Sequence, residues 1–324
     1  HTSIDWRDWE IMLPWSYPLD SKTPDRVEVL RSRFHILNEL CRATLCEFFC
    51  TAFLLTVGCC ASAQYILSRG EVVNYFGNTI GWIVALFFAI TIGYRSSGSH
   101  LNPAVSFFQL TIGNISLIRF VLFVIAQNLG AFVGASIAYA VYYEAIADFD
   151  GGHRAVSGEL ATAGIFATYP SPHLSMIGAC FDQTVATAVL CIGIGTITDK
   201  RNHVPMFMQP AFIASHVMLI GMGLAWNAGY AINPARDFGP RVFTALAGWG
   251  WEVFEFNDYQ WFWIPVMCPM LGALIGAWLY QAFIGFHMPD IVYDEMNYDC
   301  RPVKTINNEA KLREDDKSGE LNRY

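Results

Sequence analysis

The sequence predicts an all-α membrane protein in which six transmembrane helices and two re-entrant half-helices form an inverted repeat. Hydrophobic residues make up 54% of the chain and charged residues 15%, whereas soluble domains carry about 25% charged residues. The apolar residues gather in six runs near the ~20 residues that one membrane crossing requires. The tripeptide Asn-Pro-Ala occurs twice, each time before an apolar stretch too short to cross.

The six long apolar runs are the expected transmembrane helices. The two short stretches begin with Asn-Pro, and Asn is a good N-cap while Pro suits the first helical turn. We therefore expect short helices at about 103–113 and 234–246. The six expected spans cover residues 40–66, 79–95, 118–143, 174–198, 207–227 and 261–286.

Two repeated motifs divide the membrane region into halves. Asn-Pro-Ala stands at Asn102-Pro103-Ala104 and at Asn233-Pro234-Ala235, and Leu-Gly-Ala-x-x-Gly-Ala stands at Leu129–Ala135 and Leu271–Ala277. Three spans per half is an odd number, so the halves must lie upside down relative to each other. The small residues of the second motif permit close helix contact. That contact serves either packing within one chain or an oligomer face. The halves run from about 40 to 143 and from about 174 to 286.

The distribution of positive charge predicts the orientation in the membrane. Most Lys and Arg residues lie in the N-terminal segment, after spans two and four, and in the C-terminal tail. Such residues favour the cytoplasmic side. We therefore expect a cytoplasmic segment at 1–39, a membrane domain at 40–290 and a cytoplasmic tail at 291–324. The acidic stretch with Glu144, Asp148 and Asp150 is then an outward-facing loop.

The two short helices predict a pore. Entering from opposite faces, they would meet near the midplane with their partly positive N-terminal ends facing each other. Irregular backbone at that depth is tolerated only where it is buried or lines a wet cavity. Carbonyl groups would then accept hydrogen bonds from a permeating hydroxyl, the amides of Asn102 and Asn233 would donate, and the positive ends would oppose cations and protons. The expected carbonyls belong to Gly98, Ser99, His100, Leu101 and Gly229.

Glu47 and Gln183 lie inside the expected first and fourth spans, where a polar side chain is costly. Each is either part of an ion or proton site, or a brace that accepts hydrogen bonds from the re-entrant loops. Their matching positions in the two halves favour the brace. No nucleophile–base arrangement or metal-ligand spacing is present in the sequence, so we expect no enzyme activity, no cofactor and no metal site.

Two long stretches, Ser97–Val105 and Gly229–Arg241, resemble the aquaporin superfamily, and within it the animal aquaglyceroporins. Ala161–Pro172 and Ala247–Gly250 are similar to the outer loops of that family. The resemblance covers about 40–290. It implies a passive channel for glycerol, water and small neutral solutes in a lipid bilayer, forming a homotetramer in the plasma membrane. No nucleic-acid partner is expected.

The resemblance also implies a selectivity filter made of Trp82, Gly221, Tyr230 and Arg236. Gly221 would leave space where water-specific members carry a histidine. Two aromatic rings would face the carbons of glycerol, and the guanidinium would face its hydroxyls.

Asp237 and Arg241 form an i,i+4 pair of the kind that marks the glycerol branch of the family. Gly221 and Asp237 therefore argue against the alternative, a water-selective aquaporin. A coupled transporter or ion channel would be expected to show acidic residues along its pore.

Two features could regulate the pore. His100 lies two residues before Asn102 and is either a neutral brace or a candidate pH sensor, because histidine titrates near neutrality. The aromatic segment at residues 6–15 lies either at the membrane interface or across the cytoplasmic mouth.

Overall fold

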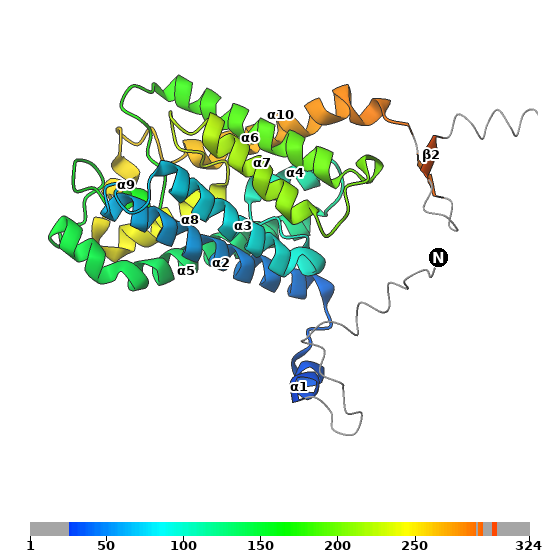
Figure 1. The fold of residues 1–324 in the computed structure, drawn as a ribbon, viewed down its shortest axis with the longest axis horizontal. Helices are drawn as coiled ribbons and strands as arrows, with labels where there is room; N and C mark the ends of the chain where they lie inside the picture. The colour runs from blue at the N-terminus through cyan, green and yellow to red at the C-terminus, as the bar shows by residue number, and fades with distance from the viewer. Residues whose placement is uncertain (1–25, 290, 294–299, 303–324) are drawn as a thin grey trace, which may run out of the picture. The chain divides into compact units, whose positions relative to one another are not determined.

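The computed structural model describes residues 26–289, 291–293 and 300–302. The chain separates into a unit of residues 1–41 and a unit of residues 42–324. The described part of the first unit contains helix α1 (Arg26–Phe34), none of whose residues is buried. The second unit holds a bundle of long helices that lie side by side (Figure 1).

All six expected spans are helices. Five of the described helices are long and apolar enough to cross a membrane, and α7, with 15 residues, is the exception among the six. Gly221 and Gly223 lie at its end, where glycine weakens a helix. The six are α2 (Glu39–Leu67), α3 (Tyr75–Ser97), α5 (Leu117–Asp150), α6 (Met176–Thr198), α7 (Gln209–Gly223) and α10 (Ile264–Phe283).

Helix α5 continues beyond its expected end and takes in Glu144, Asp148 and Asp150, which are therefore helical rather than part of a loop. The helix ends at Gly151, whose φ of 62° lies in the left-handed region that favours glycine. Asp150 is buried and binds Arg154 at 2.6 Å, so its charge is compensated at the helix end.

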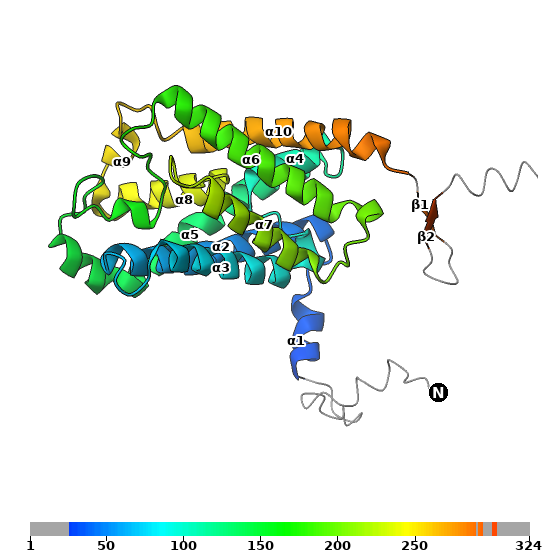
Figure 2. The same cartoon turned by 45° about the horizontal axis from the view of Figure 1, so that its top comes forward.

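The two half-helices are present as α4 (Pro103–Thr111) and α8 (Pro234–Thr244). Each begins with proline, and each is capped by the side chain of the preceding asparagine. Figure 2 shows both helices among the long ones, α4 toward one end of the bundle and α8 toward the other. This is the inverted arrangement that the repeated motifs predict.

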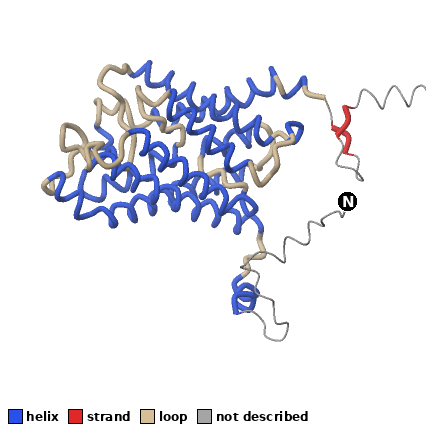
Figure 3. The backbone as a smooth tube through the Cα atoms, viewed as in Figure 1, coloured by secondary structure: helices blue, strands red, loops and turns tan. Residues whose placement is uncertain are grey.

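The described residues also contain shorter elements. Helix α9 (Glu252–Glu255) precedes the last span, and β1 (Ile291–Tyr293) pairs antiparallel with β2 (Cys300–Pro302). The sequence analysis did not predict the strand pair. Figure 3 shows the bundle as almost entirely helical, with loops joining the long helices.

The repeated glycines bring helix backbones together within the chain. A Cβ atom added at Gly130 would lie 2.3 Å from Phe48 O on α2, and one at Gly272 would lie 2.3 Å from Thr184 O on α6. The contacts repeat one turn later at Gly134 and Gly276, each 2.4 Å from a carbonyl oxygen. These motifs therefore pack span three on span one and span six on span four, which is the intrachain interpretation.

Replacing Gly134 with valine is expected to destabilise the bundle. The added side chain would meet backbone atoms of Ala52 and Thr56, which cannot move aside as a flexible side chain would. Overpacking of this kind costs about 1–3 kcal/mol. The midpoint of thermal unfolding in detergent measures the effect. The matched control is Ala140→Val on the exposed face of α5, and an equal shift in both variants would contradict the packing role.

Candidate functional site

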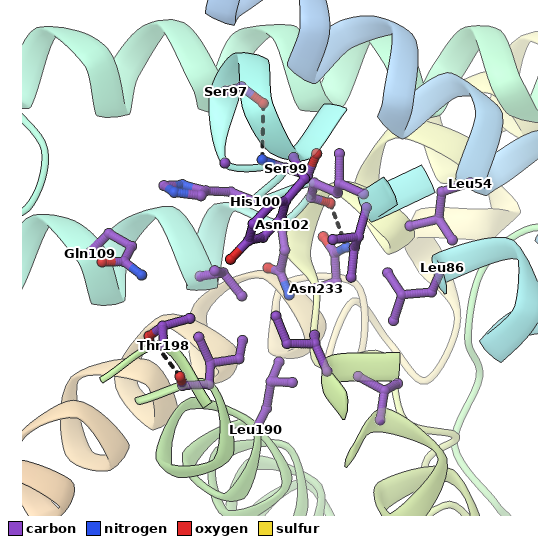
Figure 4. A pocket seen from close by; sticks show the side chains of 18 of the residues that line it. Leu54, Leu86, Ser97, Ser99, His100, Asn102, Gln109, Leu190, Thr198 and Asn233 are labelled. Atoms are coloured by element: carbon purple, nitrogen blue, oxygen red, sulfur yellow. Dashed lines mark hydrogen bonds between the residues drawn. The ribbon is translucent and has the colours of Figure 1, made fainter. Parts of the chain in front are cut away.

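A cavity of about 760 Å³ lies inside the bundle, between the half-helices and the long helices. Asn102 and Asn233 meet at its centre, and apolar side chains surround them (Figure 4). The apolar side chains labelled there are Leu54, Leu86 and Leu190.

The two asparagines hold the half-helices together. Asn102 Nδ2 donates to Ile232 O at 2.9 Å, and Asn233 Nδ2 donates to Leu101 O at 2.8 Å. Each Oδ1 meanwhile caps its own half-helix by accepting from the backbone N–H of Ala104 or Ala235. An amide NH₂ has two donors, so one hydrogen of each remains to bind a molecule in the cavity.

The expected carbonyl residues fall into two groups. Gly98, Ser99, His100 and Leu101 line the cavity, but Gly229 is not among its lining residues. The carbonyl oxygen of Gly229 instead accepts from Gln183 Nε2 at 3.3 Å. In the second half the cavity is lined by the residues that follow, Tyr230, Ala231 and Ile232.

Three residues of these loops have a positive φ angle, which residues other than glycine rarely adopt. The φ angles are 50° at Ser99, 54° at Leu101 and 41° at Ile232. A β-branched residue such as isoleucine is unusual there. Such geometry persists only where its surroundings impose it, so the bracing contacts of the two loops determine the shape of the cavity wall.

Glu47 is the main brace of the first loop. Its Oε1 accepts from Ser97 Oγ at 2.6 Å and from His100 N at 2.9 Å, and its Oε2 accepts from Leu101 N at 2.8 Å and from Gln127 Nε2 at 2.8 Å. The side chain is fully buried. Four donors therefore converge on one carboxylate, which is the arrangement expected of a brace.

Gln183 takes the corresponding place in the second half with fewer contacts. Its Oε1 accepts from Ile232 N at 3.2 Å, and its Nε2 donates to Gly229 O and to Asp182 Oδ1. A side-chain amide can both donate and accept. Gln183 therefore binds one backbone N–H group and one backbone carbonyl group of the second loop.

Three of the four residues of the expected filter line the cavity. The guanidinium carbon of Arg236 lies 4.3 Å from the centroid of the Trp82 ring, and Arg236 Nη1 donates to Phe166 O at 2.8 Å. Tyr230 also contributes to the wall. An aromatic ring and the guanidinium of Arg236 therefore lie side by side in the cavity wall.

Gly221 lies behind Tyr230 rather than on the cavity wall. A Cβ atom added there would lie 3.1 Å from Tyr230 Cζ and 3.1 Å from Thr79 Cγ2. The space that the sequence analysis expected to be open is therefore taken by the tyrosine ring. Because Gly221 has no side chain, the Tyr230 ring can pack against it.

The structure adds residues that the sequence analysis missed. Gly58 on α2 lets the Trp82 ring lie flat, since a Cβ there would meet ring atoms at 2.3 Å. Ser62 accepts from Trp82 Nε1 at 2.9 Å and fixes the ring orientation. The only feature of the sequence that could have indicated this contact is a glycine, Gly58, within an apolar helical run. Sequence alone does not reveal that the Trp82 ring packs against it.

Asp237 and Arg241 form an ion pair with both side chains fully buried. Arg241 Nη2 donates to Asp237 Oδ1 at 2.8 Å and to Thr168 O at 2.7 Å, while Asp237 Oδ2 accepts from Thr168 N at 2.8 Å. Arg241 Nη1 also binds Val253 O. Burial raises the pKa of nearby Tyr169 to about 12, so this ring stays neutral beside the guanidinium. The pair ties α8 to the loop around residue 168.

His100 lines the cavity, with Nδ1 3.1 Å from Ser106 Oγ and its ring edge-to-face with Phe123. That it senses pH stays a prediction. The aromatic segment at residues 6–15 lies outside the described residues.

Comparison with known proteins places this site in a family. A model of the major intrinsic protein family matches residues 36–280. The chain is similar to aquaporin-9 of Homo sapiens, with 42% identity over 277 residues that cover 85% of this chain and 94% of that one. It is similar to aquaporin-10 of Homo sapiens, with 35% identity over 262 residues covering 81% and 87%. An X-ray structure of the aquaglyceroporin from Plasmodium falciparum matches with a TM-score of 0.69 and 27% identity, covering 76% of this chain and 98% of that one. The chain therefore belongs to the major intrinsic protein family.

Proposed function

We propose that this chain is a passive transmembrane channel that conducts glycerol, water and other small neutral solutes and excludes ions and protons. The observation that carries the proposal is the cavity. Trp82, Tyr230 and Arg236 line it together with the paired asparagines, and the guanidinium of Arg236 lies against the Trp82 ring. The similarity to aquaporin-9, aquaporin-10 and an aquaglyceroporin supports the same solute class.

A glycerol molecule presents hydroxyls along one edge and carbon along the other, and the cavity offers a partner to each. Arg236 and the free amide hydrogens of Asn102 and Asn233 donate to hydroxyl oxygens, and loop carbonyls accept hydroxyl hydrogens. The rings of Trp82 and Tyr230 cover the carbon edge. The solute exchanges its water shell for these contacts, so no coupled energy source is required.

Ion exclusion follows from the charges around the cavity. Among its described lining residues none is Asp or Glu, whereas Arg95, Arg119 and Arg236 are present. The N-terminal ends of α4 and α8 add partial positive charge at the centre. Cations are therefore repelled, and the donors at the asparagines interrupt a proton-conducting file of water.

The setting in the membrane belongs to the same proposal. Large apolar side chains are exposed on the long helices, among them Phe49, Phe88 and Ile125, which suits contact with lipid or with other subunits. We place both termini in the cytoplasm of a plasma-membrane homotetramer, with the channel domain at 40–290, a cytoplasmic segment before it and a cytoplasmic tail after it.

A water-selective channel is the second candidate. It is favoured by one observation, the Tyr230 ring that fills the space beside Gly221. Proteoliposomes loaded with the purified channel distinguish the candidates through glycerol-driven swelling, osmotic water flux and ion current. Water flux without glycerol flux would leave the second candidate, and ion current would contradict both.

Replacing Gly221 with histidine is expected to lower glycerol flux by about tenfold or more while water flux falls less. The imidazole cannot share the space with the Tyr230 ring and the Thr79 methyl, so one of the rings must enter the passage. Light scattering from proteoliposomes measures both fluxes. The matched control is Gly223→His, because a Cβ atom added at Gly223 would have no neighbouring atom within 4 Å. Equal loss of both fluxes would contradict the filter assignment.

A further inference from the structure

Two free cysteines lie where α6 packs against α10, away from the pore described above. Cys180 is partly exposed on the second turn of α6, and Cys268 is buried on the second turn of α10. Cys268 belongs to a small apolar cluster with Ala179, Trp261 and Ile264, and Cys180 packs against that cluster. Neither cysteine lines the central cavity, so the pore makes no use of these thiols.

Glycine contacts fix the alignment of the two helices. A Cβ atom added at Gly272 on α10 would lie 2.3 Å from Thr184 O on α6, and the same kind of contact recurs four residues later on both helices. Equal steps along both helices mean that α6 and α10 run in the same direction in close contact (Figure 2). One turn before the Gly272 contact, the residue on α10 is Cys268 and the residue on α6 is Cys180.

Side-chain contacts extend this alignment to the cysteines. Thr184 Oγ1 donates to Cys268 O at 3.5 Å, and the thiols of Cys180 and Cys268 are side-chain hydrogen-bond partners. A disulfide requires Cα atoms about 4.4–6.8 Å apart, which residues on two neighbouring helices reach only where the helices pack closely. The packing of α6 on α10 therefore brings two free thiols together.

A second cavity, of about 430 Å³, lies beside the pair. Ala179, the neighbour of Cys180 in sequence, and Ile264, one turn before Cys268, both line this cavity. A small neutral oxidant can therefore come close to the thiols. With both termini in the cytoplasm, as proposed above, α10 begins at the outer face of the membrane. Disulfides form and persist on that side.

We propose that Cys180 and Cys268 are a modification site, at which hydrogen peroxide converts the two thiols into a reversible disulfide. Cys180 is the more exposed thiol. Its thiolate attacks one peroxide oxygen, which gives a sulfenic acid and releases the other oxygen as water. The Cys268 sulfur then attacks the sulfenic sulfur, forms the S–S bond and displaces hydroxide, which takes the thiol proton and leaves as a second water. Two thiols are oxidised and one peroxide is reduced to two waters. The choice of membrane face rests on the proposed topology, whereas the pairing does not.

The disulfide has a consequence for stability. It joins residues that are far apart in sequence, and such a cross-link restricts the unfolded chain more than the folded one. Gln183, which braces the second pore loop, lies on the turn of α6 that follows Cys180. Oxidation therefore ties the helix that carries this brace to α10. We expect the midpoint of thermal unfolding to rise by several degrees on oxidation and to fall again with a reducing agent.

The test uses the purified full-length chain, treated with hydrogen peroxide and digested under conditions that preserve disulfides. We expect mass spectrometry to find one peptide pair joined through Cys180 and Cys268, and dithiothreitol to release it. Labelling of free thiols should fall by two per chain. Cys180→Ser and Cys268→Ser should each abolish both the joined pair and the rise in the unfolding midpoint.

The matched control is Cys191→Ser, which removes another thiol of α6 and should form the joined pair like the parent. Peroxide treatment that takes Cys180 only to the sulfinic acid while Cys268 stays free would overturn the proposal. Joining of either cysteine to a different cysteine would overturn it as well. A parent without glycerol flux but with the joined pair would remove the proposed function and leave the disulfide standing.

Discussion

A chain carrying Glu47→Leu is expected to lose its folded first pore loop and, with it, solute flux. Leucine leaves four donors without their acceptor, two of them the backbone N–H groups of His100 and Leu101. Each unsatisfied buried donor costs about 1–3 kcal/mol, and Ser99 and Leu101 already hold left-handed backbone conformations that depend on these contacts. The summed cost exceeds about 4 kcal/mol, which is large for one substitution.

Glu47→Gln tests whether the brace requires a carboxylate or whether any polar side chain of the same shape is sufficient. Glutamine keeps the shape and one acceptor oxygen, but its NH₂ group faces donors such as Gln127 Nε2. We expect a folded channel with lower flux and a lower unfolding temperature. The control is Glu159→Gln at an exposed position. Yield in detergent, the unfolding midpoint and glycerol flux are the measurements, and a Glu47→Leu chain with parental stability and flux would refute the brace.

Much of the fold was predictable because apolar run length and helix capping are local properties. Asn-Pro marks the start of α4 and α8, and both begin at the expected proline. The predicted end of α5 was wrong. The last charged residue of the helix, Asp150, is compensated by contacts with Arg154 and Thr162, which only the folded chain brings together.

The sequence predicted which residues form the site, but not how their side chains contact one another. The residue type and repeat position of Glu47 indicated a brace, and the structure supplies its four donors. The exchange of hydrogen bonds between Asn102 and Ile232, and between Asn233 and Leu101, depends on how the halves meet. Gly221 was interpreted as open space because sequence does not reveal that the Tyr230 ring turns into it.

Asp237→Ala is expected to destabilise the chain by about 3–5 kcal/mol, because removing one partner of a buried ion pair leaves the other charge uncompensated. Arg241 has no exposed side-chain surface. The substitution also removes the acceptor for Thr168 N, which holds the adjoining loop next to α8. The same loop supplies Phe166 O to Arg236. We therefore expect weaker solute selection together with lower stability.

A double-substitution cycle separates the charge from the shape. Arg241→Met alone leaves Asp237 buried without its cation, whereas Asp237→Leu with Arg241→Met removes both charges. Replacing both members of a buried ion pair with apolar residues is often tolerated far better than replacing either member alone. We expect the double variant to unfold closer to the parent than Asp237→Leu or Arg241→Met does. Glycerol flux should still change, because Val253 O loses the Arg241 donor and Thr168 O keeps only its bond from Trp261 Nε1. Additive losses in the double variant would show that the pair acts as two independent contacts and not as a compensated charge.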